Sequence, residues 1–243
     1  MPEAAVPPGA RPEDPPLPLT EHLLELRRRL VVSLSLVAGG AVVSFYFSGA
    51  LLSWLARPVG ELVFIAPMEA FETRMRLALY GGVLLSLPFL LHQVWLFVAR
   101  ALEPRWRRGL LTMVPLSYAL FMAGAAFCLY VVLPAGMKFL FSFASEGVRP
   151  LMSLGAYVSF VTTLSLAFGV IFQFPLVLYV LDWMGILKRS QIAPQRRAVY
   201  FATFIVAAFF TPDMVGQVCL AFCMIALFEL SLLAMALRGR SAR

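Results

Sequence analysis

Six strongly apolar runs, separated by short charged segments, make up most of the chain. Four of them exceed the roughly 20 residues that a helix needs to cross about 30 Å of hydrocarbon; they cover residues 31–56, 77–99, 109–137 and 151–181. Two shorter candidates follow at residues 198–211 and 214–237, the second broken by Glu229. The pattern predicts an all-α integral membrane protein with six transmembrane helices, the fifth and sixth being short.

Composition supports the membrane class. The chain is 61% hydrophobic and only 14% charged, whereas a soluble domain usually carries about 25% charged residues. The net charge of +7 does not form a nucleic-acid patch, because the charges lie in the gaps between the apolar runs. No nucleic-acid partner is therefore expected, and the partner that the composition does require is the lipid bilayer.

The gaps alternate in charge, which predicts the orientation. Most of the 20 Lys and Arg residues lie before the first run, between runs two and three, between runs four and five, and after run six. Basic residues mark the cytoplasmic side, so both termini are expected to be cytoplasmic. We expect a disordered Pro-rich tail at 1–19 that is not a signal peptide, a membrane domain at 20–238 and a basic tail at 239–243. The external segment 57–76 is expected to contain a short interfacial helix.

The sequence contains no enzyme signature that we recognise. It lacks GxxxxGK[ST] and GxSxG, and its two histidines, His22 and His92, do not form a convincing pair with a serine. Its three cysteines lie in apolar runs without metal-ligand spacing, which is typical of small packing residues. We therefore predict a protein that is not an enzyme and that needs neither cofactor nor metal.

A few polar side chains lie inside the apolar runs, where each is costly. Gln173 precedes Pro175, which should bend the fourth span; its amide either satisfies the freed backbone or faces a wet surface. Glu229 either joins helices or takes part in partner binding or transport. Gln217 is the third such residue.

Glu25 stands ahead of the first span, followed by Arg27, Arg28 and Arg29. Its spacing to Arg29 suits an intrahelical ion pair, which contributes only about 0.2–0.5 kcal/mol. Carboxylates contribute little to orientation, so topology does not require Glu25. A carboxylate at a membrane surface can instead receive a guanidinium through two parallel hydrogen bonds.

Seven stretches, taken in order, resemble the motifs of the TatC family, the membrane receptor of the twin-arginine protein translocase. They are "HLLELRRRL" (22–30), "ARP" (56–58), "APMEAF" (66–71), "HQVWLFVARAL" (92–102), "SFVTTLSLAFGVIFQFP" (159–175), "TPDMVGQ" (211–217) and "LFE" (227–229). The resemblance covers about residues 20–237.

The resemblance implies a multi-pass protein of the plasma (inner) membrane that binds twin-arginine signal peptides. Such proteins assemble with TatA- and TatB-type single-span partners, associate within a larger complex, and export folded proteins with the proton-motive force. Carried over by position, the signal-peptide residues would be Glu25, Arg27, Pro58, Phe97 and Glu103. The intramembrane and partner-binding polar residues would be Gln173, Asp213, Gln217 and Glu229.

One departure from the family pattern concerns the first cytoplasmic loop. The family commonly has a Glu directly before its paired basic residues, whereas Trp106 precedes Arg107-Arg108 here. Glu103 is the only acid of this loop, and whether it replaces the missing one stays open. The alternative function is a secondary transporter of a small solute, which would need midplane polar groups on broken helices, often in repeated halves; no repeat is visible.

Overall fold

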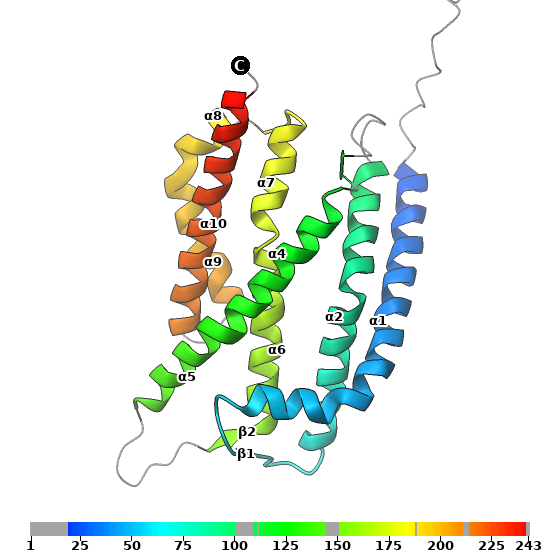
Figure 1. Cartoon of the computed structure of the whole chain (residues 1–243), viewed down its shortest axis with the longest axis vertical. Coiled ribbons are helices and arrows are strands. Elements are labelled where there is room, and N and C mark those ends of the chain that lie inside the picture. The colour runs from blue at the N-terminus through cyan, green and yellow to red at the C-terminus, as the bar shows by residue number, and fades with distance from the viewer. Residues whose placement is uncertain are drawn as a thin grey trace, which may run out of the picture.

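The computed structural model describes residues 19–100, 109–110, 112–143, 151–187, 189–210 and 214–241. Long helices account for nearly all of them (Figure 1). The elements are α1 (Leu19–Ala56), β1 (Leu62–Val63), α2 (Glu69–Arg100), α4 (Val114–Phe127), the π-helical η1 (Cys128–Val132), α5 (Leu133–Phe141), β2 (Met152–Ser153), α6 (Leu154–Ile171), α7 (Phe174–Trp183), α8 (Arg189–Ile192), the 3₁₀-helical η2 (Ala193–Gln195), α9 (Arg196–Phe210) and α10 (Met214–Ser241).

Five helical stretches in the described part of the chain are long and apolar enough to cross a membrane. They correspond to the first four expected spans and to the sixth. The expectation that the sixth is short is wrong: α10 runs for 28 residues without interruption through Glu229, because a single glutamate does not break a helix. By contrast, α9 has 15 residues, about 22 Å at 1.5 Å per residue. A sixth crossing therefore stays a prediction.

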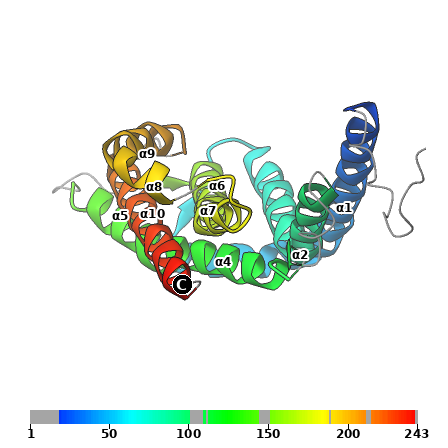
Figure 2. The same cartoon turned by 90° about the horizontal axis from the view of Figure 1, so that it is seen from above.

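Seen from above, the helices form a curved wall rather than a ring (Figure 2). α1 and α2 lie at one end of the wall and α9 and α10 at the other, with α4 crossing in front of α6 and α7 (Figures 1 and 2). α1 is packed mainly against α2 and exposes most of its apolar side chains, such as Leu30 and Val42, as expected of a lipid-facing helix.

Small residues bring α1 and α2 into close backbone contact. A Cβ built on Gly82 would lie 2.6 Å from the Ala41 nitrogen, and one on Gly40 would lie 2.8 Å from the Gly82 carbonyl oxygen. Across the same seam, the Ser86 hydroxyl donates to the Leu36 carbonyl at 2.8 Å. Small residues and interhelical hydrogen bonds are what hold helices together in lipid, where burial from water gives no driving force.

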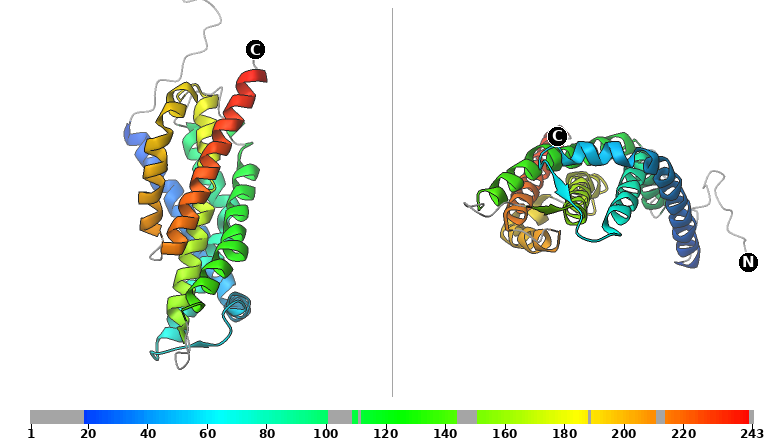
Figure 3. Two further views of the ribbon diagram at one scale, coloured as in Figure 1. Left: turned by 90° about the vertical axis from the view of Figure 1, so that its left-hand side faces the viewer. Right: turned by 90° about the horizontal axis from the view of Figure 1, so that it is seen from below.

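Before its end α1 changes direction, and its last turns (light blue) lie across the base of the bundle (Figures 1 and 3). Helices bend sharply at Gly/Ser pairs, and this part of α1 contains Ser48 followed by Gly49. The buried Ser48 hydroxyl donates to the Phe45 carbonyl at 2.7 Å. The bend positions Leu55, whose carbonyl accepts from the Tyr157 hydroxyl of α6 at 2.7 Å.

A small cap, formed by residues 57–68 and 151–153, closes this end of the bundle. In it β1 and β2 pair in parallel, with Leu62 opposite Met152; the all-α expectation missed this pair, which is only two residues long. The separate interfacial helix expected at 57–76 is absent, since its polar residues form the first turns of α2 instead. The Glu69 carboxylate accepts from the backbone N–H groups of Ile65, Ala66 and Gly155 and from the Ser153 hydroxyl.

The bend expected at Pro175 is confirmed. α6 ends at Ile171 and α7 begins at Phe174, with Pro175 in the first turn of α7. Proline is favoured there because its missing N–H would have had no intrahelical partner. Just before the break, Phe168 is fully buried in a core to which η1, α6, α9 and α10 contribute.

Candidate functional site

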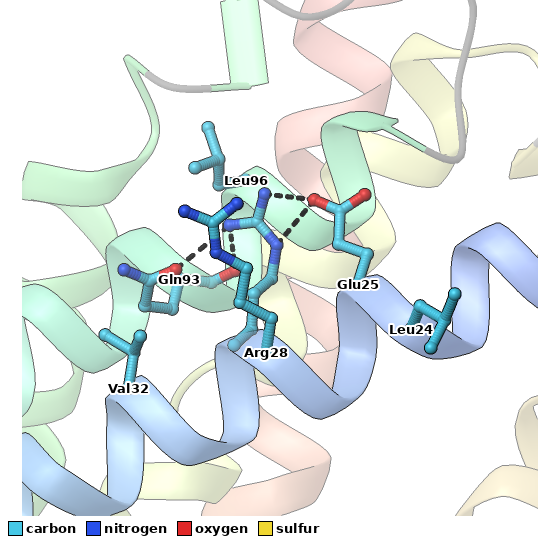
Figure 4. A pocket seen from close by; sticks show the side chains of 7 residues that line it. Leu24, Glu25, Arg28, Val32, Gln93 and Leu96 are labelled. Carbon is cyan, nitrogen blue, oxygen red and sulfur yellow. Dashed lines mark hydrogen bonds and ion pairs between the residues drawn. The ribbon is translucent and has the colours of Figure 1, made fainter.

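A pocket of about 440 Å³ opens between the first turns of α1 and the last turns of α2 (Figure 4). The two helices run in opposite directions, so the start of α1 meets the end of α2. Polar and apolar side chains both line the pocket: Leu24, Glu25, Arg28, Arg29, Val32, Gln93 and Leu96. We call this the α1–α2 pocket.

Glu25 and Arg29 form an ion pair at the floor of the α1–α2 pocket. The Arg29 Nε donates to the Glu25 Oε1 at 2.8 Å, and the Arg29 Nη2 donates to the same oxygen. Both side chains are only 10% exposed. The intrahelical pair expected from the spacing is therefore present, and it is far less exposed than a surface ion pair.

Gln93 completes the arrangement from α2. The Arg29 Nη1 donates to the Gln93 side-chain oxygen at 3.0 Å and approaches its backbone carbonyl at 3.5 Å. Glu25 and Gln93 therefore lie on opposite sides of one guanidinium (Figure 4). Sequence reasoning missed Gln93, although a polar residue inside the apolar run 77–99 was the available signal.

The other residues expected to receive a signal peptide are not all brought to the α1–α2 pocket. Arg27 is exposed on α1, and Arg28 rather than Arg27 lines the pocket. Phe97 is half-buried on α2, directly after the lining residue Leu96. Pro58 lies in the cap, at the opposite end of α1 from Glu25. Glu103 falls outside the described residues, and so does Asp213, which was expected among the intramembrane and partner-binding residues instead.

Gln173 ties the break between α6 and α7 to a neighbouring helix. Its amide nitrogen donates to the Ser117 backbone carbonyl of α4 at 2.8 Å, so it does not serve the backbone of its own helix. The Ser117 hydroxyl in turn accepts from the Trp95 Nε1 of α2 at 2.6 Å. Three helices thus meet through polar contacts at this level.

A second pocket, of about 260 Å³, lies between α2 and α7 and is bordered by Gln173 and Trp95. The remaining lining side chains are apolar: Leu91, Val94, Val98, Val177, Val180, Leu181, Met184 and Ile186. Gln173 thus borders a largely apolar hollow, which we call the α2–α7 pocket; the wet surface given above as one alternative for Gln173 stays a prediction.

Glu229 joins α10 to α9. Its carboxylate accepts from the Tyr200 hydroxyl at 2.6 Å and pairs with Arg196 at 3.2 Å. Towards the other end of the same helix pair, the Gln217 amide nitrogen donates to the Phe204 carbonyl at 3.3 Å. Of the two alternatives for Glu229, contact between helices is the one found within this chain.

Comparison with known proteins places these features in a family. The family described as "Sec-independent protein translocase protein (TatC)" matches residues 21–222. The chain belongs to the TatC family. Sec-independent protein translocase protein TatC of Carboxydothermus hydrogenoformans is 33% identical over 90% of this chain and 93% of its own length. TatC of Aquifex aeolicus is 34% identical over 89% and 93%.

A solved TatC structure has the same fold. The crystal structure described as "Twin Arginine Translocase Receptor- TatC" superposes with a TM-score of 0.80 at 33% identity, covering 89% of this chain and 98% of that one. The apolar helices and the TatC relationship together make this chain a multi-pass membrane protein of Sec-independent protein translocation.

Proposed function

We propose that this chain is the signal-peptide receptor of a twin-arginine translocase, with Glu25 as the carboxylate that receives a signal arginine. The observation that carries the proposal is the position of Glu25: a carboxylate held at the floor of an open pocket, at the start of the first helix. Interior pairs are screened less than surface pairs, so a guanidinium that reaches Glu25 would interact more strongly than one on the surface.

The size and lining of the α1–α2 pocket support this proposal. A volume of about 440 Å³ accommodates an arginine side chain together with part of its neighbour, and Leu24, Val32 and Leu96 offer apolar surface for the arginine stems. The crystallised relative is itself described as a twin-arginine translocase receptor. A solute carrier, the alternative function, is not favoured by the family relationship.

Orientation and partners belong to the same proposal. We place the chain in the inner membrane with the α1–α2 pocket and both termini on the cytoplasmic side, and the cap outside, because the basic residues lie mainly at the pocket end.

Single-span partners of the TatA and TatB type would dock along the α9–α10 pair, near Asp213, Gln217 and Glu229, and near Gln173. The exposed α9 side chains Phe201 and Phe209, 71% and 86% exposed, offer apolar surface for such helices.

Replacing Glu25 with glutamine tests the proposal. The change keeps size and one acceptor but removes the charge, and breaking a buried charged hydrogen bond costs at least about 1.4 kcal/mol, or tenfold in affinity. We expect Glu25→Gln to bind a fluorescent twin-arginine peptide at least about tenfold more weakly, in lipid nanodiscs. Glu61→Gln is the matched control, since Glu61 is exposed in the cap. Undiminished binding by a folded Glu25→Gln variant would refute the receptor assignment.

A further inference from the structure

The carboxylate proposed to receive a signal arginine already holds an arginine. Arg29 presents one edge of its guanidinium, Nε and Nη2, to Glu25 and its remaining nitrogen, Nη1, to Gln93. An incoming guanidinium therefore does not meet an empty carboxylate. It has to share Glu25 with Arg29 or displace it.

We propose that Arg29 is an internal competitor for Glu25, and that Gln93 is the positioning residue that retains Arg29 when an incoming arginine displaces it. Together they set the selectivity of the α1–α2 pocket for arginine over lysine. This inference rests on the proposed function, because it describes how the same pocket discriminates between two cationic side chains.

The contacts of Gln93 explain the retaining role. Arg29 is 8% exposed, so once it leaves Glu25 its guanidinium has little access to water. The Gln93 side-chain oxygen at 3.0 Å and the Gln93 carbonyl at 3.5 Å still hold Nη1. A buried donor left without an acceptor is unfavourable. The Arg29–Gln93 contact therefore matters more in the peptide-bound state than in the free state, and its loss weakens peptide binding.

The competitor also accounts for selectivity. A guanidinium offers two parallel N–H donors that match a carboxylate, while an ammonium is a compact, strongly hydrated point charge. Against an unoccupied carboxylate both cations would bind. The Oε1 of Glu25 already accepts from both Nε and Nη2 of Arg29, so only a group that supplies two donors, as a guanidinium does, gains from the exchange. Arg29 thus makes the pocket specific by disfavouring lysine, rather than only by favouring arginine.

A double-mutant cycle on the full-length protein in lipid nanodiscs tests the proposal. The variants are Gln93→Leu, Arg29→Met and the double variant, with Gln195→Leu, an exposed glutamine of η2 outside the pocket, as control. Affinities are measured for a twin-arginine peptide and for the same peptide with both arginines changed to lysine. The ratio of the two affinities is the decisive readout, because a merely structural defect would lower both together.

We expect Gln93→Leu to weaken twin-arginine binding about tenfold, the change that corresponds to one hydrogen bond to a charged group. We expect Arg29→Met to strengthen twin-lysine binding and to reduce the arginine-to-lysine ratio about tenfold. In the Arg29→Met background, Gln93→Leu should have no effect, since its partner is gone. Unchanged binding by Gln93→Leu, or an equal effect in both backgrounds, overturns the retaining role. An unchanged ratio in Arg29→Met overturns the competitor.

The outcome for Glu25→Gln separates this inference from the function on which it rests. If Glu25→Gln loses binding while the Gln93 and Arg29 variants behave like Gln195→Leu, the receptor assignment holds and the competitor is wrong. If Glu25→Gln binds as the unmodified protein does, the receptor assignment itself fails.

Discussion

Replacing Gly82 with alanine would place a methyl group in the seam between α1 and α2. The new Cβ would lie 2.6 Å from the Ala41 nitrogen and 2.8 Å from the Ala41 Cα and the Val37 carbonyl oxygen. Ordinary contacts begin at about 3.4 Å. All three obstacles are backbone atoms, which cannot rotate away as a flexible side chain can, so the two helices would have to separate by about 0.8 Å, the difference between 2.6 and 3.4 Å.

The size of the effect follows from a comparison with Gly39 of α1. Gly39 has nothing within 4 Å of its built Cβ, so Gly39→Ala gains helix propensity, about 1 kcal/mol, without a clash. Gly82→Ala gains the same propensity but adds overpacking, which costs typically about 1–3 kcal/mol. The propensity terms cancel. The free energy of unfolding of Gly82→Ala should therefore be about 1–3 kcal/mol below that of Gly39→Ala.

The same displacement should reach the α1–α2 pocket. Gly40, which faces Gly82 across the seam, is 11 residues from Arg29, and Gly82 is 11 residues from Gln93. Both distances correspond to about 16 Å along a helix. Because the two helices are antiparallel, Arg29 and Gln93 lie opposite each other at the same distance from the seam. Separating the helices stretches this contact from its present 3.0 Å.

Titration with dodecyl sulfate in mixed micelles, followed by circular dichroism, measures the stability difference, and peptide binding measures the effect on the pocket. Gly82→Ala should be the less stable variant and the weaker binder. Equal stability of the two variants, or greater stability of Gly82→Ala, would show that the α1–α2 seam is not the tight contact described above.

Two further substitutions test the cap and the helix break. Glu69→Gln should loosen the cap and speed its cleavage by an added protease, because an amide NH₂ would face N–H groups that now donate hydrogen bonds to the carboxylate. The control is Glu72→Gln, since Glu72 is an exposed glutamate in the same helical turn and its replacement should leave cleavage unchanged. Equal cleavage of both variants would contradict the role of Glu69. Gln173→Leu loses one neutral hydrogen bond, at 2.8 Å to the Ser117 carbonyl. It should lower the free energy of unfolding by about 0.6 kcal/mol, the average found for such contacts between membrane helices. A much larger loss of stability in a denaturant titration would mean that Gln173 contributes more to folding than this one bond.

Local patterns predicted much of the fold. Hydropathy located the long helices, and Pro175 located the break between α6 and α7, because proline acts on its own helix whatever surrounds it. The spacing of Glu25 and Arg29 likewise predicted their ion pair. Each of these conclusions depends on residues at most a few positions apart, within reach of rules for a single helix.

What could not be predicted depends on contacts between distant segments. Gln93 is 64 residues from Arg29, and no periodicity relates the two. Glu69 was expected in an interfacial helix, but its partners at 153 and 155 come from another part of the chain. Pro58 does not lie near Glu25 because the two residues are at opposite ends of α1. The two motifs follow each other in the sequence, but the length of a 38-residue helix separates them.

Both ends of α2 are fastened to the rest of the bundle. At the cap, Glu69 bonds to Ser153 and Gly155, and Arg76 donates to Ser159 at 2.6 Å, so α2 is fastened to the start of α6. At the pocket end, the Trp95 Nε1 donates to the Ser117 hydroxyl of α4 at 2.6 Å, and Trp95 and Ala99 share a buried core with Leu176 and Val180 of α7. α1, by contrast, is packed mainly against α2. A movement that opens or closes the contact between Gln93 and Arg29 is therefore expected from the first turns of α1, while α2 stays in place.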